Sequence, residues 1–139
     1  MAYFLDTNTC IYALKGIHPP IEKQLRALSP AHVRVASIVK AELLFGARKS
    51  QQSRHATEIV EAFLFPFEIV PFCDKGSLCY AQIRLDLEKR GTPIGPNDLI
   101  LAATVLAHDG TLVTHNTKEF RRVGGLKVED WAQGSRRPR

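Results

Sequence analysis

The sequence predicts an α/β protein whose mainly parallel sheet of about four to five strands is sandwiched by helices. Short apolar runs alternate along the chain with segments of helical periodicity. Strands that alternate with helices are joined by right-handed crossovers, which make the strands parallel and place the helices on the sheet faces. No repeat or linker interrupts the 139 residues, so we expect one domain over 1–132 and a flexible basic tail, 133–139.

The chain begins with a predicted strand and two predicted helices. The apolar run at 3–5 is too short for a helix and is followed by polar residues, so it predicts a buried strand. Asn8 belongs to the residue types that cap helices, and the helix that it begins ends at Gly16. The prolines at 19–20 then open a second helix, because proline fits the first helical turn.

The middle of the chain predicts two more strands and two more helices. Residues 33–35 alternate apolar with polar, as in a strand, and Ser37 caps a helix that runs through Arg48. Helical spacing of apolar residues resumes at 51–64. A run at 67–70 between two prolines predicts the next strand.

The last part of the chain predicts two long helices and two strands. They are a helix from Asp74 to Gly91, a helix that Asn97 or Asp98 starts and His108 ends, and strands at 111–114 and 126–128. In parallel sheets, ligands bind outside the carboxyl ends of the strands. We therefore expect Asp6, Asp98 and the segment 114–116 to lie along one edge of the sheet.

The composition is basic. Lys and Arg number 19 against 14 for Asp and Glu, which gives a net charge of +5 and a pI of about 9.3. A basic protein with an acidic site favours a polyanionic substrate, whereas the alternative is a charge that serves solubility alone. Four basic residues gather late in the chain: Lys118, Arg121, Arg122 and Lys127.

Several classes of protein are disfavoured by what the sequence lacks. No apolar run reaches the ~18–20 residues of a membrane helix, and the start has no basic segment before an apolar one, so we expect a soluble, cytoplasmic protein with no membrane partner. The three cysteines include no C-x-x-C pair and the five histidines no i,i+4 pair, which disfavours disulfide frameworks and zinc fingers. Neither a P-loop nor a G-x-G-x-x-G turn is present.

Three carboxylates stand in apolar sequence. Asp6 directly follows the first strand, Glu42 shares a helix face with Ile38 and Phe45, and Asp98 opens a helix. A buried carboxylate is unfavourable unless a positive group lies nearby. Converging carboxylates repel one another, and a divalent cation turns that repulsion into attraction. The pattern therefore favours a metal-dependent enzyme.

Each acid also has a simpler explanation. Asp6 can cap the first helix, Glu42 can form an internal salt bridge or be partly exposed, and Asp98 can complement the helix dipole. Phosphatases of the haloacid dehalogenase type also place an Asp after their first strand, but they need a second acid two residues later, where this chain has Asn8. The conjunction of three acids at one edge favours the metal site.

An ordered set of motifs covers nearly the whole chain. Besides the helix of Glu42, the motifs are FLDTNTCI at 4–11, GPND at 95–98, VTHNTKEF at 113–120, VGGL at 123–126 and EDW at 129–131. In this set the chain resembles the PIN-domain ribonucleases, specifically the VapC-type toxins of VapBC toxin–antitoxin modules. The resemblance implies a PIN-like fold.

The resemblance also implies a catalytic set. Asp6, Glu42 and Asp98 match the three principal acids of the family, and Asp6 and Asp98 are the implied direct ligands of Mg²⁺, for which Mn²⁺ can substitute. Many members have a fourth acid where this chain has Asn116, which can still ligate through its carbonyl oxygen or hold a water. Glu119 is a candidate to compensate for the missing charge.

The implied function is that of a Mg²⁺-dependent endoribonuclease toxin. By resemblance the RNA substrate is tRNA, with the anticodon loop of initiator tRNA as the target, and the implied partners are a VapB-type antitoxin and a second copy in a homodimer. The alternative is a catalytically silent PIN scaffold that binds RNA or a protein partner. The three retained carboxylates argue against that alternative, because a binding module has no use for them.

Overall fold

The computed structural model describes residues 1–133 and confirms the α/β class, with one five-stranded sheet. The strands are β1 (Tyr3–Leu5), β2 (Val33–Ala36), β3 (Glu68–Val70), β4 (Thr111–Val113) and β5 (Lys127–Glu129). Their spatial order is β3-β2-β1-β4-β5, and every neighbouring pair is parallel. The expected basic tail lies, from residue 134 onward, outside the described residues.

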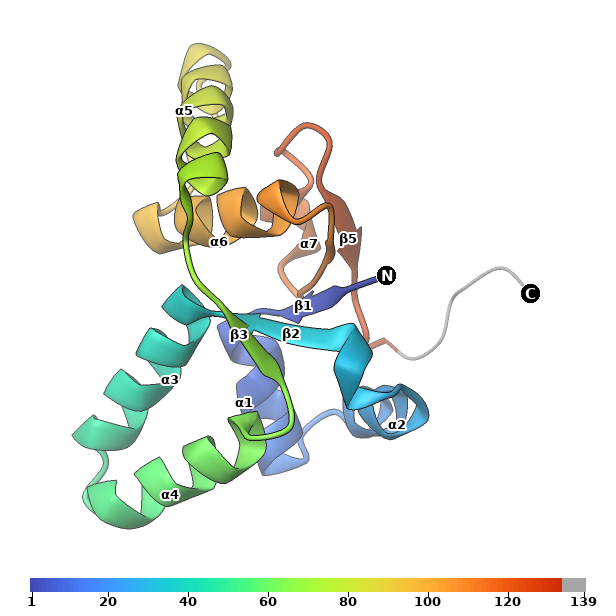
Figure 1. Ribbon diagram of the computed structural model, residues 1–139, viewed down its shortest axis with the longest axis vertical. Helices are drawn as coiled ribbons and strands as arrows, with labels where there is room; N and C mark the ends of the chain where they lie inside the picture. Colours follow the sequence, from blue (N-terminus) through green and yellow to red (C-terminus); the bar gives the residue numbers. More distant parts are fainter. Residues whose placement is uncertain (134–139) are drawn as a thin grey trace.

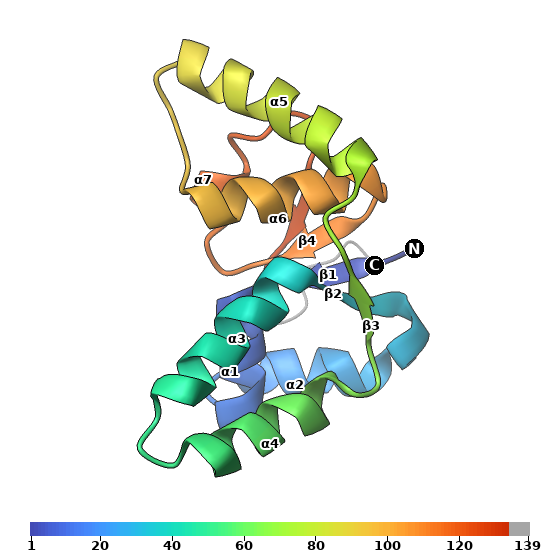
Figure 2. The same cartoon turned by 60° about the vertical axis from the view of Figure 1, so that its left-hand side comes forward.

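Helices cover both faces of the sheet. They are α1 (Thr7–Lys15), α2 (Pro19–Ala27), α3 (Ser37–Lys49), α4 (Ser53–Leu64), α5 (Asp74–Lys89), α6 (Pro96–Ala107) and α7 (Thr117–Phe120), with a 3₁₀ turn at Pro30–His32 that the sequence did not predict. The helices α1 to α4 lie on one face and α5 to α7 on the other (Figures 1 and 2). Right-handed crossovers require this, because the chain crosses the sheet in one direction from β1 to β3 and in the other from β3 through β4 to β5.

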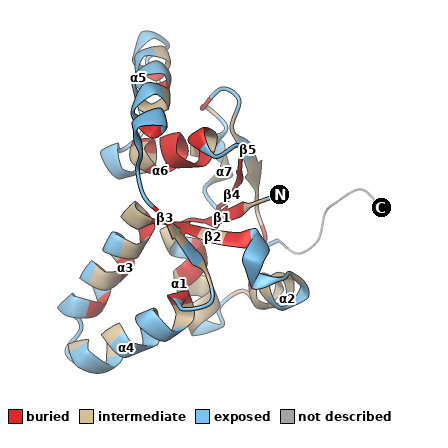
Figure 3. Cartoon of the chain, in the orientation of Figure 1, coloured by how far each residue is buried: buried red, intermediate tan, exposed pale blue. Residues whose placement is uncertain are grey.

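The core lies between the central strands and α6. The strands β1 and β4 are buried throughout, and α6 is the most deeply buried helix (Figure 3). The ring of Phe4 is completely buried. A Cβ atom on Gly110 would lie 2.5 Å from Cε1 of Phe4, so only glycine lets the chain enter β4 beside this ring. Close packing therefore holds β1 and β4 in place against each other.

Two predicted helix caps are wrong. The cap of α1 is Asp6 rather than Asn8, since Asp6 has extended backbone and its side chain accepts a hydrogen bond from the N–H of Thr9. The cap of α3 is Ala36, and Ser37 is the first helical residue. Both helices thus begin directly where a strand ends, without a connecting turn.

The predicted buried face of α3 is also wrong. Its buried residues are Val39, Leu43 and Ala47, whereas the Phe45 side chain is 64% exposed and Glu42 is half-buried at the margin. In α5, similarly, the apolar Leu78 is 74% exposed. Both helices have apolar residues on more than one face, so their spacing alone does not identify the packed face. Within residues 1–133, no helix is both long and apolar enough to cross a membrane.

Candidate active site

The candidate site lies where β1 and β4 end. The two strands are neighbours, but α1 leaves β1 toward one face of the sheet and α7 leaves β4 toward the other. In open α/β sheets the ligand crevice is found at such a switch point, outside the carboxyl ends of the strands. Asp6 follows β1 and Thr114 follows β4, and the Thr114 hydroxyl donates a hydrogen bond of 2.6 Å to Oδ2 of Asp6. The strand order thus joins residues that are 108 positions apart.

Asp6 is held on both carboxylate oxygens. Its Oδ1 accepts the backbone N–H of Thr9 at 2.8 Å while Oδ2 accepts Thr114, and only 7% of the residue is exposed. Burial raises the pKa of Asp6, the hydrogen bonds from Thr114 and Thr9 lower it, and the charge of Glu42 raises it again, with a net upward shift. The same carboxylate therefore caps α1 and faces the other acids.

Glu42 joins the site from α3. Its Oε1 accepts the hydroxyl of Thr7, in the first turn of α1, at 2.5 Å. Its Oε2 accepts the side-chain amide of Asn97, in the first turn of α6, at 3.2 Å. One carboxylate thus connects three helices that approach the edge of the sheet from different parts of the chain.

Asp98 and Glu119 form a carboxyl pair on the other side of the crevice. Burial raises the pKa of Asp98 to about 7, together with the hydrogen bond and charge of Glu119 and the charges of Glu42 and Asp6. Two carboxyl groups can share a hydrogen bond only through a proton, and the raised pKa keeps part of the Asp98 population protonated near neutral pH. Glu119 is therefore the fourth acid of the cluster.

Asn116 forms hydrogen bonds with both Glu119 and Thr114. Its side-chain amide donates to Oε2 of Glu119 at 3.1 Å, and its backbone N–H donates to Oγ1 of Thr114 at 3.0 Å. The structure therefore brings the predicted Asp6, Glu42 and Asp98 together, and it places Asn116 next to Glu119. Among the residues that the structure describes, no three His, Cys, Asp or Glu side chains are already arranged to hold a metal ion.

Two polar contacts of the site were missed from the sequence. Thr9 lies three residues after Asp6, which is the spacing of a helix cap, so its N–H contact could have been found once Asp6 was taken as the cap. Asn97 directly precedes Asp98, but its contact with Glu42 joins residues 55 positions apart. No local pattern indicates a contact of that range.

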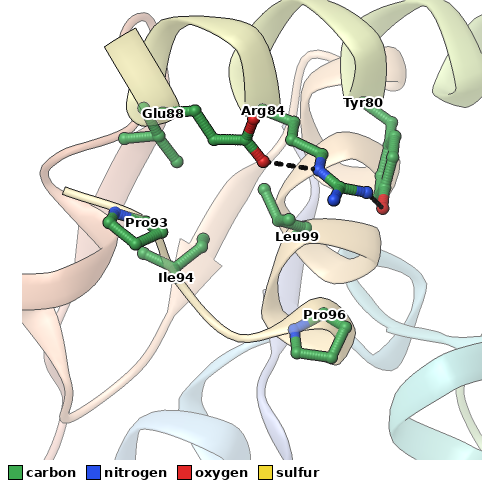
Figure 4. A pocket seen from close by; sticks show the side chains of 8 residues that line it. Tyr80, Arg84, Glu88, Pro93, Ile94, Pro96 and Leu99 are labelled. Carbon is green, nitrogen blue, oxygen red and sulfur yellow. Dashed lines mark hydrogen bonds and ion pairs between the residues drawn. The ribbon is translucent and has the colours of Figure 1, made fainter. Parts of the chain in front are cut away.

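A cavity of about 320 Å³ lies between α5 and α6 (Figure 4). Its lining residues are Tyr80, Arg84, Leu87, Glu88, Pro93, Ile94, Pro96 and Leu99. Along the α5 wall of the cavity, Arg84 donates hydrogen bonds to Glu88 at 2.9 Å and to the Tyr80 hydroxyl at 3.0 Å. None of the four acids lines this cavity. The acids instead lie along the edge of the sheet, with Asp98 and Glu119 partly exposed, as a site for a large substrate requires.

Comparison with known proteins agrees with this geometry. The PIN domain family matches residues 3–126. Ribonuclease VapC2 of Rickettsia felis is 38% identical over 94% of this chain and 98% of its own length. The tRNA(fMet)-specific endonuclease VapC of Salmonella typhimurium is 33% identical, with the same two coverages.

Solved structures of relatives superpose closely on this chain. VapBC2 of Rickettsia felis, bound to a DNA fragment from its promoter, superposes with a TM-score of 0.88 at 37% identity, over 94% of this chain and 99% of that one. DNA-bound VapBC of Salmonella typhimurium superposes with a TM-score of 0.89 at 32% identity, over 94% and 98%. The chain therefore belongs to the PIN domain family, and within that family to the VapC ribonucleases. PIN-domain nucleases generally depend on metal ions.

Proposed function

We propose that this protein is a Mg²⁺-dependent endoribonuclease that hydrolyses a phosphodiester bond of tRNA in the cytoplasm, as the toxin of a toxin–antitoxin pair. The observation that carries the proposal is the convergence of Asp6, Glu42, Asp98 and Glu119 at one crevice, with raised pKa values for Asp6 and Asp98. Relatives named tRNA(fMet)-specific endonuclease support tRNA as the substrate, with the anticodon loop of initiator tRNA as the proposed target.

The donor set fits a hard divalent cation. Carboxylate oxygens are the ligands that Mg²⁺ prefers, and the raised pKa of Asp98 reflects negative charge that a cation would neutralise. We propose Asp6 and Asp98 as the direct ligands, with Glu119 beside them and Mn²⁺ able to substitute. When bound, the ion supplies activation of water and stabilisation of the charge that develops on the phosphate. The cation and the proton shared by Asp98 and Glu119 compete for the same oxygens.

The side chains of the protein then have distinct roles. Glu42, held on one oxygen by Thr7 and on the other by Asn97, orients the attacking water and accepts its proton. Thr114 and the N–H of Thr9 hold the Asp6 carboxylate in one orientation, which saves the reorganisation that a mobile ligand would need. The net charge of +5 favours association of the protein with the RNA backbone.

We further propose two protein partners. Solved relatives are VapBC toxin–antitoxin complexes, which supports a VapB-type antitoxin that covers the acidic crevice. Phe45 on α3, Phe65 after α4 and Leu78 on α5 are 64, 90 and 74% exposed, which is apolar surface of the kind that a homodimer or antitoxin contact buries.

The direct test is cleavage of tRNA by the purified chain. Total tRNA is incubated with the protein in Mg²⁺ or in a chelator, and the cleaved end is mapped. We expect one major Mg²⁺-dependent cut, and none with Asp98→Asn. The rival function, a silent scaffold, predicts tRNA binding without cleavage under every metal condition, and that result would refute the enzymatic proposal.

A further inference from the structure

Three aromatic rings form a second cluster at the same edge of the sheet. The rings of Tyr12 and His18 meet edge to face, with their centroids 4.7 Å apart. The His115 ring lies 5.7 Å from that of His18 and 6.3 Å from that of Tyr12. The three residues come from α1, from the loop after α1 and from the loop after β4. We call Tyr12, His18 and His115 the ring cluster.

His115 is the outermost ring, and a buried acid fixes its orientation. Its side chain is 44% exposed, and Nδ1–H donates to Oδ2 of Asp130 at 3.0 Å. The Asp130 side chain is only 11% exposed, and its Oδ1 accepts the N–H of Ala132 at 2.9 Å. Two neighbouring rings and a fixed carboxylate already hold the His115 ring in place. Its exposed surface can therefore bind a ligand with little further loss of side-chain entropy.

The backbone joins the ring cluster directly to the acids. His115 stands between Thr114, which binds Asp6, and Asn116, which binds Glu119. Along α1, Tyr12 lies about 9 Å beyond Asp6 at 1.5 Å per residue. A nucleic-acid strand with one phosphate at the acids therefore has a neighbouring nucleotide near the ring cluster.

We propose that His115 stacks on a nucleobase next to the cleaved phosphodiester and thereby positions the RNA. The inference rests on the proposed RNA-cleaving function and adds to it a residue that selects and orients the substrate. Flat rings that are exposed at a basic protein surface are the usual stacking platforms for unpaired bases. Asp130, Tyr12 and His18 are positioning residues, because they act through His115.

Two other uses of the ring cluster fit the structure less well. The Nδ1 atom of His115 is already engaged by Oδ2 of Asp130, which disfavours a second metal site here. A protein contact would favour aliphatic and aromatic surface without charge, whereas the outermost ring of this cluster is an imidazole that is hydrogen-bonded to the Asp130 carboxylate.

The test separates binding from chemistry. Cleavage of tRNA by His115→Ala is expected to show a KM raised about tenfold or more with kcat nearly unchanged, because stacking contributes to binding. His115→Phe keeps the ring and should stay within about twofold of the wild-type KM, whereas His115→Gln keeps a polar partner for Asp130 and should resemble Ala. His55→Ala, an exposed histidine on α4, is the matched control.

A modified substrate shows whether the contact is to a base. Synthetic RNA of the cleaved segment is made with an abasic nucleotide at each position flanking the cut, and affinity is measured by fluorescence anisotropy in the Asp98→Asn background. One abasic position should weaken binding by the same factor as His115→Ala, and the two changes together should weaken it no further. Thermal unfolding of each variant shows that the fold is retained.

The outcomes distinguish the two proposals. Wild-type protein that cleaves RNA, with unchanged KM and affinity in His115→Ala, would overturn this inference and leave the proposed function standing. Wild-type protein that neither cuts nor binds RNA would overturn both. Unchanged RNA affinity together with a change from dimer to monomer in light scattering would make the ring cluster a protein contact and also overturn the inference.

Discussion

The two sides of the crevice are built differently. On the side of β1 and α1, Asp6 is buried and accepts a hydrogen bond on each oxygen from groups that the core holds in place. On the side of α6 and α7, Asp98 and Glu119 are half-buried, and burial together with the hydrogen bond and charge of Glu119 raises the pKa of Asp98 to about 7. Packing fixes the orientation of the carboxylate on the first side, whereas neighbouring charges control the protonation of the carboxyl groups on the second. The second side should therefore respond to pH and metal more than the first.

The largest expected effect tests whether both sides serve one reaction. Asp6→Asn and Asp98→Asn should each reduce tRNA cleavage by about 10³-fold or more, a loss of roughly 4 kcal/mol of transition-state stabilisation. Both proteins should remain folded by circular dichroism, and Asp109→Asn, at an acid that is almost fully exposed, is the control. Near-normal cleavage by either variant would remove that residue from the site.

The second prediction compares the hydroxyls that hold the carboxylates. Thr114→Val should lower cleavage about 10- to 100-fold and unfolding free energy by about 1–3 kcal/mol, because the buried Asp6 carboxylate loses a hydrogen bond. Thr7→Val should have a smaller effect, since its partner Glu42 is half-buried and keeps Asn97. Cleavage assays and urea unfolding measure both changes. Equal losses in the two variants would show that the burial of the carboxylate does not determine the size of the effect.

The third prediction concerns pH. The pKa of Asp98 rises from its ordinary value of 3.8 to about 7 in the folded chain, so folding favours the protonated form. The stability that the Asp98 carboxyl group contributes is fully present below about pH 3.8 and is lost as the pH rises through about 7. In a chelator, urea unfolding should show a stability that falls across this window, and Mg²⁺ should restore it at the upper end.

The variant Asp98→Asn is the control for this pH effect. It removes the titrating group while keeping the side-chain shape, so its stability should fall less steeply over the same window. A wild-type curve as flat as that of the variant would show that the acids do not interact.

The smallest expected effect distinguishes the roles of Glu119 and Asn116 in metal binding. Glu119→Gln should weaken metal binding about tenfold, because it removes a charge next to Asp98. Asn116→Asp should bring no gain, since it replaces the amide that donates to Glu119 with a like charge. Calorimetric metal titrations measure both. Tighter binding by Asn116→Asp with unaltered binding by Glu119→Gln would restore Asn116 as the neutral ligand that the sequence first suggested.

Local pattern predicted the elements well and their packed faces poorly. The strand at 3–5 and the helix that Gly16 ends were found because apolar runs and terminating residues are local signals. The packed face of α3 was missed because Phe45 and Leu43 are both apolar, yet only Leu43 is buried. Burial depends on what another part of the chain covers, which the spacing within one helix does not contain.

The sequence by itself determined the fold class and the family, and it predicted Asp6, Glu42 and Asp98 as the candidate acids, since each rests on residue type and order. Only the tertiary structure decided that Glu119 completes the cluster, that Asn116 supports it, and that His115 faces outward beside it. The physical reason is that the pKa and the orientation of a carboxylate depend on the groups that surround it in space. Those surroundings come from strands and helices up to 108 residues apart, which only the packed sheet brings together.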